Sequence, residues 1–103
     1  GKIEMLRVQE NPKKFWAKQI NSLVDLELIG DYIFENCSEV EEVEIYDIPN
    51  TVEMIGITIS DYNSVEFFIF TLSQASWFLI ENNQYRKVKN EDFQNNYGIV
   101  THE

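Results

Sequence analysis

The second half of the chain contains four stretches in which apolar and polar residues alternate. They read EVEEVEIYDI at 39–48, VEMIGITIS at 52–60, SVEFFIFTL at 64–72 and SWFLIENNQYRKV at 76–88. Alternation with a period of two, interrupted by turn residues such as Asn82 and Asn83, is typical of β-strands and hairpins. The short connections favour antiparallel pairing over helical crossovers. We therefore predict an antiparallel meander of four or five strands.

The residues before this region have a helical spacing. Asn11 and Pro12 indicate a helix start, because asparagine caps a helix and proline is favoured at its first position. The apolar residues that follow at intervals of three and four are Phe15, Trp16, Ile20, Leu23 and Val24. The pattern fits one helix to about Asn36 or two helices separated at Gly30. We favour the break, because glycine in a helix interior costs about 1 kcal/mol.

The two ends of the chain complete the predicted fold. Residues 1–8 alternate loosely, as a short edge strand would. Asn90, Glu91 and Asp92 predict the start of a short second helix, which Gly98 ends. Residues 99–102 fit a last short strand or a tail. The sequence thus predicts a single α+β domain over residues 1–103, with an N-terminal helix packed on the meander and a short C-terminal helix.

Residues 64–72 are apolar on both faces of the predicted strand. We expect such a strand to be central in its sheet and covered on both sides. The N-terminal helix supplies one cover. The second cover is left open between the short C-terminal helix, a dimer partner and a target protein.

The 103 residues include 8 basic and 18 acidic side chains, which gives a formal net charge of −10. Every Lys and Arg lies near one end of the chain, and residues 19–85 contain none but carry thirteen acids. Phosphate binding needs clustered basic residues, so this balance argues against nucleic acid and anionic membranes as partners. The apolar runs are too short to span a bilayer and no leader pattern is present, so we expect a cytoplasmic protein.

The residues that usually carry catalysis are poorly placed. His102 is the only histidine and lies beside the C-terminus, where chains are usually frayed. Cys37 is the only cysteine, and the neighbouring carboxylates disfavour its thiolate, so we expect a small, partly buried apolar residue. No phosphate-binding glycine motif or paired-cysteine zinc motif occurs. We therefore predict a protein that is not an enzyme and has no cofactor.

The acidic cluster around residues 39–47 has four interpretations. As a metal site it lacks the spacing of a calcium loop, and as a glycosidase site it lacks a deep cleft. As a solvated surface it would favour solubility, although such surfaces usually mix both signs of charge. As a docking surface it would attract a basic protein. We favour docking, with a negative field from five carboxylates and anchors from two tyrosines. These candidate partner-binding residues are Glu39, Glu41, Glu42, Glu44, Asp47, Tyr46 and Tyr62.

Residues 35–88, with the four strand patterns quoted above, resemble small bacterial immunity proteins of polymorphic and contact-dependent toxin systems. The resemblance implies a cytosolic inhibitor that binds one cognate toxin domain, commonly a nuclease with a basic cleft. It assigns no role to an individual residue. Two alternatives stay open. One is a phage or plasmid protein that imitates DNA and blocks a host nucleic-acid-binding enzyme, and the other is a dimeric structural or regulatory domain without catalysis.

Overall fold

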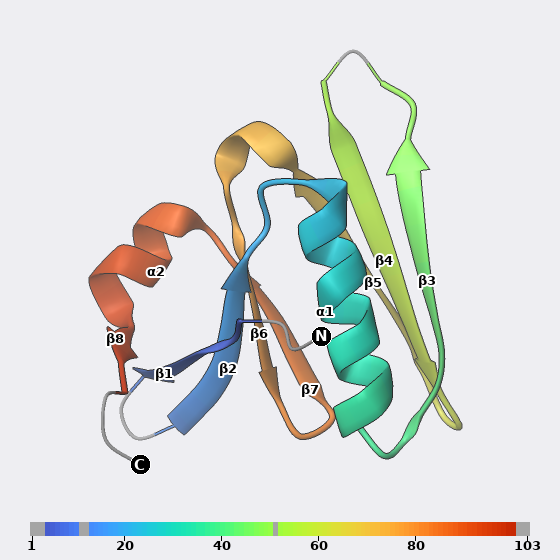
Figure 1. Cartoon of the computed structure of the whole chain (residues 1–103), viewed down its shortest axis with the longest axis horizontal. Helices are drawn as coiled ribbons and strands as arrows, with labels where there is room; N and C mark the ends of the chain where they lie inside the picture. Colours follow the sequence, from blue (N-terminus) through green and yellow to red (C-terminus); the bar gives the residue numbers. More distant parts are fainter. Residues whose placement is uncertain (1–3, 11–12, 51, 101–103) are drawn as a thin grey trace.

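The computed structural model describes residues 4–10, 13–50 and 52–100. Over these ranges the chain is α+β, with two α-helices and two antiparallel sheets (Figure 1). The elements in chain order are β1 Leu6–Glu10, β2 Lys13–Gln19, α1 Leu23–Asn36, β3 Val40–Ile48, β4 Met54–Asp61, β5 Val65–Thr71, a 3₁₀ turn Leu72–Gln74, β6 Trp77–Glu81, β7 Gln84–Val88, α2 Asn90–Asn96 and β8 Gly98–Ile99.

The strands divide between two sheets. One has five strands in the order β7-β6-β2-β1-β8, and the other has three in the order β3-β4-β5. The prediction of one continuous meander is therefore wrong, because β6 and β7 join the N-terminal strands instead of β5. The β6–β7 hairpin itself is confirmed, with Glu81 opposite Gln84 and a positive φ of 55° at Asn82 in the turn.

Residues 13–19, predicted as the first part of the helix, form strand β2. Phe15 and Ala17 are buried on one face of the sheet, while Trp16 and Lys18 point to the other. Phe15, Trp16 and Ile20 have a spacing that fits a helix, but Phe15 and Ala17 also fit one buried face of a strand. Pairing with β1 and β6 on both sides decided between the two periods. The helix start predicted at residues 11 and 12 lies outside the described residues.

Helix α1 begins at Leu23 and continues without a break past Gly30. Ser22 caps it, because its hydroxyl oxygen accepts a hydrogen bond from the Asp25 backbone N–H. The predicted break is wrong for a packing reason. A Cβ atom on Gly30 would lie 2.9 Å from Ile45 Cδ1, so the glycine lets the helix pass close over β3.

The buried side chains form two clusters, one on each face of the five-stranded sheet. The larger cluster lies between that sheet, α1 and the inner face of the three-stranded sheet. Its fully buried members include Leu26, Ile57, Phe70 and Phe78. The smaller cluster lies under α2, where Phe93 stacks on Trp77 with ring centroids 3.8 Å apart.

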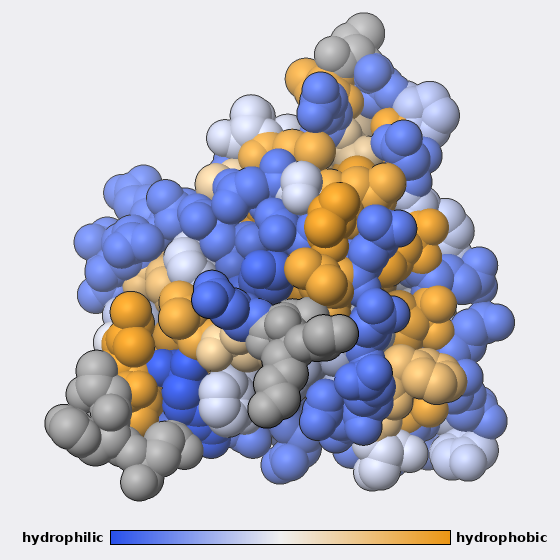
Figure 2. Space-filling view, in the orientation of Figure 1, coloured by the Kyte–Doolittle hydropathy of each residue, from blue (hydrophilic) through white to orange (hydrophobic). Residues whose placement is uncertain are grey.

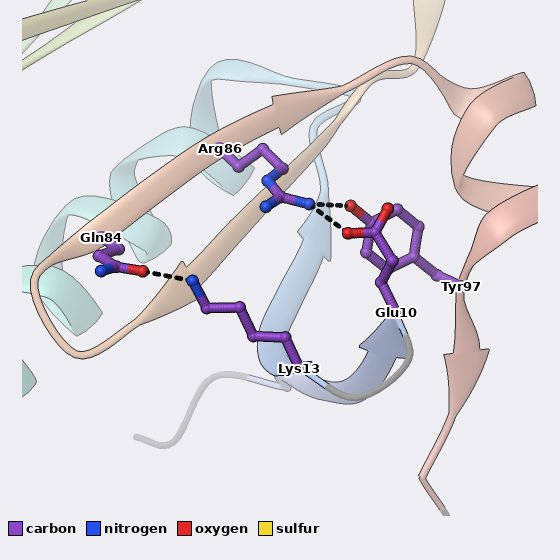
Figure 3. Close-up of polar contacts among 5 residues, drawn as sticks. All are labelled: Glu10, Lys13, Gln84, Arg86 and Tyr97. Carbon is purple, nitrogen blue, oxygen red and sulfur yellow. Dashed lines mark hydrogen bonds and ion pairs between the residues drawn. The ribbon is translucent and has the colours of Figure 1, made fainter.

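The basic residues at both ends of the chain meet in the five-stranded sheet. Arg86 on β7 donates hydrogen bonds to a Glu10 carboxylate oxygen at 2.8 Å and to the Tyr97 hydroxyl at 2.6 Å (Figure 3). Lys13 on β2 donates to Gln84 at 2.7 Å. The cations in this cluster thus tie the strands of one sheet to one another and to the chain after α2.

Strand β5 is an edge strand, which corrects the prediction that residues 64–72 are central. Its inner face packs on the core through Phe68 and Phe70. Its outer face leaves Val65 and Phe67 exposed. Helix α2 lies on the other sheet, so it is excluded as the second cover, and a dimer partner or a target protein remains.

Candidate protein-binding surface

The outer face of the three-stranded sheet is the side turned away from α1 and the core. Pairing aligns its residues in rows across β3, β4 and β5. Three rows are Glu42–Ser60–Val65, Glu44–Thr58–Phe67 and Tyr46–Gly56–Ile69, and the fourth is Ile48–Met54–Thr71. We use "outer face" for these twelve residues, none of which is basic.

Aromatic and aliphatic side chains form the centre of the outer face. The exposed fractions are 52% for Phe67, 39% for Ile69 and 38% for Tyr46. The Phe67 and Tyr46 rings meet edge to face with centroids 6.0 Å apart. A Cβ atom on Gly56 would lie 2.9 Å from Phe67 Cε1, so the glycine lets this ring lie against the sheet.

A shallow concavity of about 610 Å³ continues this apolar centre toward the β3–β4 end. Besides Tyr46, Phe67 and Ile69, its lining includes Ile48 and Thr58. Monomeric proteins usually leave large hydrophobic side chains singly on the surface, whereas contiguous ones mark interaction sites. The outer face therefore has the character of a protein-binding surface.

Two carboxylates stand beside the apolar centre on strand β3. Glu42 and Glu44 are two residues apart and so share the outer face. A hydrogen bond with Glu44 and the repulsion between the two charges raise the pKa of Glu42. The two acids therefore repel each other at neutral pH, and a cation bound between them would relieve that repulsion.

The opposite shift occurs at Asp61, the last residue of β4, where the chain turns toward β5. Its Oδ1 accepts hydrogen bonds from the backbone N–H groups of Asn63 at 2.8 Å and Ser64 at 2.7 Å, which lower the pKa of Asp61. Its ionised form is therefore favoured by the folded turn, whereas the ionised form of Glu42 is disfavoured on the sheet.

These two shifts predict opposite effects of removing one negative charge. The folded protein binds a proton at Glu42 more readily than the unfolded chain, so Glu42→Gln should raise the free energy of unfolding at pH 7. This gain should vanish as the pH falls below about 4, the unfolded pKa of a glutamate.

Asp61→Asn should lower the free energy of unfolding at pH 7, because the folded turn favours the ionised carboxylate. This decrease in stability should become smaller as the pH falls through the lowered pKa of Asp61 in the folded protein. Urea unfolding at several pH values measures both. Shifts of the same sign at pH 7 would contradict the prediction.

The structure separates the other predicted binding residues. Glu39 lies in the turn between α1 and β3, and Glu41 lines a groove between those two elements. Asp47 pairs with Ile55 in the inner-face register, yet it is exposed and lines the concavity of the outer face together with Tyr46. Tyr62 is 77% exposed in the β4–β5 turn. Of the seven residues, Glu42, Glu44 and Tyr46 thus lie in the rows of the outer face, and Asp47 borders its concavity.

The carboxylates of β3 have no cationic partner within the described part of the chain. The ion pairs found there join Arg7 to Glu81, Lys18 to Asp25 and Arg86 to Glu10. Basic residues that are separated from the acidic stretch along the sequence are therefore also separated from it in the folded protein. The basic side chains of the described ranges lie on β1, β2, β7 and the residue after β7, while the whole three-stranded sheet and α1 have none.

Phe67, Ile69 and Val65 belong to the surface but were not among the predicted binding residues. Their strand carried a signal, since both of its faces are apolar. Alternation could not show which face would stay uncovered, because that depends on which face packs on the five-stranded sheet, as Phe68 and Phe70 do on Phe78.

Other chemistry finds little support in the described ranges. Cys37 is buried, and burial raises the pKa of its thiol, which donates to the Asn82 carbonyl at 2.9 Å. Within residues 4–10, 13–50 and 52–100, no three metal-ligating side chains converge on one point. Neither helix of these ranges is long and apolar enough to cross a membrane.

Comparisons of the chain with protein-family models, with curated proteins and with solved structures found no match.

Proposed function

We propose that this protein is an inhibitor that binds a basic protein partner through the outer face of its three-stranded sheet. One observation carries the proposal. The exposed apolar centre around Tyr46, Phe67 and Ile69 is bordered on β3 by Glu42 and Glu44, and the sheet holds no base. Interfaces commonly combine a central apolar anchor with charges that steer the partner.

The chemistry of the partner follows from the charges. A second copy of the chain would bring an equally acidic sheet against this one, which costs repulsion. A basic protein would instead gain attraction during approach. A nuclease that holds phosphates needs a positive cleft, so an acidic inhibitor of a toxin nuclease fits this surface. The resemblance of residues 35–88 to immunity proteins supports the same proposal.

Reversing the charges on the outer face should slow association. We expect the double variant Glu42→Lys with Glu44→Lys to lower the association rate with the partner at least about tenfold at low salt. The unmodified protein should lose a similar factor when salt is raised, because screening weakens steering. Stopped-flow mixing with the partner captured from source cells measures both rates. The matched control is Glu4→Lys with Glu27→Lys, which changes the net charge equally at exposed positions away from the outer face.

Two further measurements separate the alternatives. An inhibitor that imitates DNA would compete with duplex DNA for several unrelated basic proteins, whereas the proposed inhibitor should bind one cognate partner. A dimeric structural domain would show a mass that falls on dilution in light scattering. The proposed role of the carboxylates would be wrong if the association rate did not change with salt or in the double variant Glu42→Lys with Glu44→Lys.

A further inference from the structure

Strand β3 leaves a long sheet edge open. It is the outermost strand of the three-stranded sheet and runs for nine residues (Figure 1). Within the described ranges only β4 pairs with it. The backbone N–H and C=O groups of alternate β3 residues therefore point to solvent, as at any edge strand.

The opposite edge of this sheet is engaged. Lys87 of β7 donates a 2.7 Å hydrogen bond to the Ile69 carbonyl on β5. Phe68 of β5 packs edge to face on Phe78 of the other sheet, with centroids 5.1 Å apart. The β5 edge thus lies against the body of the protein, and β3 offers the long free edge.

A groove of about 290 Å³ runs beside this edge, between α1 and β3. Its apolar lining comes from Gly30, Phe34, Val43 and Ile45, and Phe34 is 59% exposed. Its acidic lining comes from Asp31 and Glu35 of α1 and from Glu41 and Glu42 of β3. In the space-filling view, hydrophobic side chains lie over α1 and toward β3, with hydrophilic ones among them (Figure 2).

We propose that β3 accepts an extended, lysine- or arginine-rich segment of the partner as an added strand, with one cationic side chain seated in the groove. The inference rests on the proposed function, which makes the partner basic. An added strand lies about 4.8 Å from its neighbour and sends alternate side chains to opposite faces. On the inner side they meet Phe34 and Glu35, where a cation contacts both a ring and a carboxylate. On the outer side they meet Glu42 and Glu44.

The same charges exclude a second copy as the added strand. Pairing β3 with another β3 would place Glu42 and Glu44 among the carboxylates of the copy, and like charges on adjacent strands are destabilising. The shift in register between Val40 and Glu42 also distorts the start of the edge. The edge therefore resists self-association but remains favourable for a cationic strand.

A peptide titration tests this binding mode. The probe is a short synthetic peptide of alternating lysine and valine, added to the isotope-labelled full chain at low salt. We expect saturable amide shifts and slowed hydrogen exchange along β3, with side-chain shifts at Phe34 and none centred on β5. A peptide of alternating glutamate and valine should not bind. Shifts centred on Phe67 of the outer face instead of β3 would overturn the proposal.

A matched pair of variants tests the groove. Glu35→Lys should weaken peptide binding by about tenfold, because it places a like charge beside the seated cation. Glu27→Lys is on the same helix, is exposed and does not line the groove, so it should leave the affinity nearly unchanged. If both variants weakened peptide binding equally, the loss would reflect the overall charge of the protein, and the proposed binding of a cationic side chain in the groove would be wrong. If the peptide does not bind β3 while reversal at Glu42 and Glu44 still slows the captured partner, the strand addition fails and the proposed function stands. If that reversal has no effect, the proposed function fails.

Discussion

Replacing Phe78 with alanine should lower the free energy of unfolding by about 3–5 kcal/mol. Phe78 is fully buried where the two sheets meet. Its ring lies 5.1 Å from that of Phe68 and 5.7 Å from that of Phe70, both on β5, and 6.2 Å from that of Tyr85 on β7. Alanine would remove the ring that joins the sheets and leave a cavity between them.

The matched control is Phe67→Ala, which makes the same chemical change on an exposed strand position. Phe67 is 52% exposed and contacts the ring of Tyr46, so its loss should cost only about 1–2 kcal/mol. Domains of this size are stable by about 5–15 kcal/mol, so the Phe78 variant would lose a large part of the total. Urea denaturation gives both values. Equal losses from the two variants would contradict the placement of Phe78 in the core and of Phe67 on the surface.

The contrast between Phe67 and Phe78 also shows what the sequence could predict. The alternating pattern predicted the ends of β3, β4, β5, β6 and β7 to within about three residues. It did so because turn residues, which are polar or small, flank each of these strands in the sequence. It did not decide which face of β5 would be buried, since Phe67 and Phe68 are equally apolar. Phe68 is partly buried because it packs on Phe78 of β6, a partner in the other sheet that alternation cannot reveal.

The errors near the N-terminus have a related cause. Residues 13–19 form a strand because β6, some sixty residues later, pairs with β2. Local spacing cannot report such a partner. Gly30 signalled a helix break by its intrinsic preference, yet packing against Ile45 fixed it inside α1.

The charge pattern was the part of the candidate site that could be predicted best. The stretch without bases includes α1 and the whole three-stranded sheet, so most of the segregation along the sequence became segregation between layers; β6 is the exception, because it lies between the basic strands β7 and β2. The individual residues were harder to predict. Alternation along β3 places Glu42 and Glu44 on the same face, while Glu41 lines the groove beside α1. Asp47 belongs to the inner-face register but lines the concavity of the outer face, which alternation alone could not show.

Removing the aromatic pair on the outer face should weaken partner binding more than any change confined to the rim. We expect Tyr46→Ala with Phe67→Ala to raise the Kd for the captured partner about 30-fold or more, which corresponds to about 2 kcal/mol. The two rings touch, so the single variants should not be additive. Titration calorimetry with the captured partner measures the Kd, and urea unfolding checks that the variant remains folded.

Tyr62→Ala provides the comparison, because it removes another exposed tyrosine from the same acidic half of the chain. Tyr62 lies in the β4–β5 turn, outside the rows that make up the outer face, and within the described residues no ring packs against it. A side chain at such a rim position usually contributes less than about 1 kcal/mol to binding. If Tyr62→Ala weakened binding as much as the double variant, the partner would be centred on the turn. If the double variant left the Kd unchanged, the apolar centre would not be the anchor, because its two largest exposed rings would then contribute no binding energy.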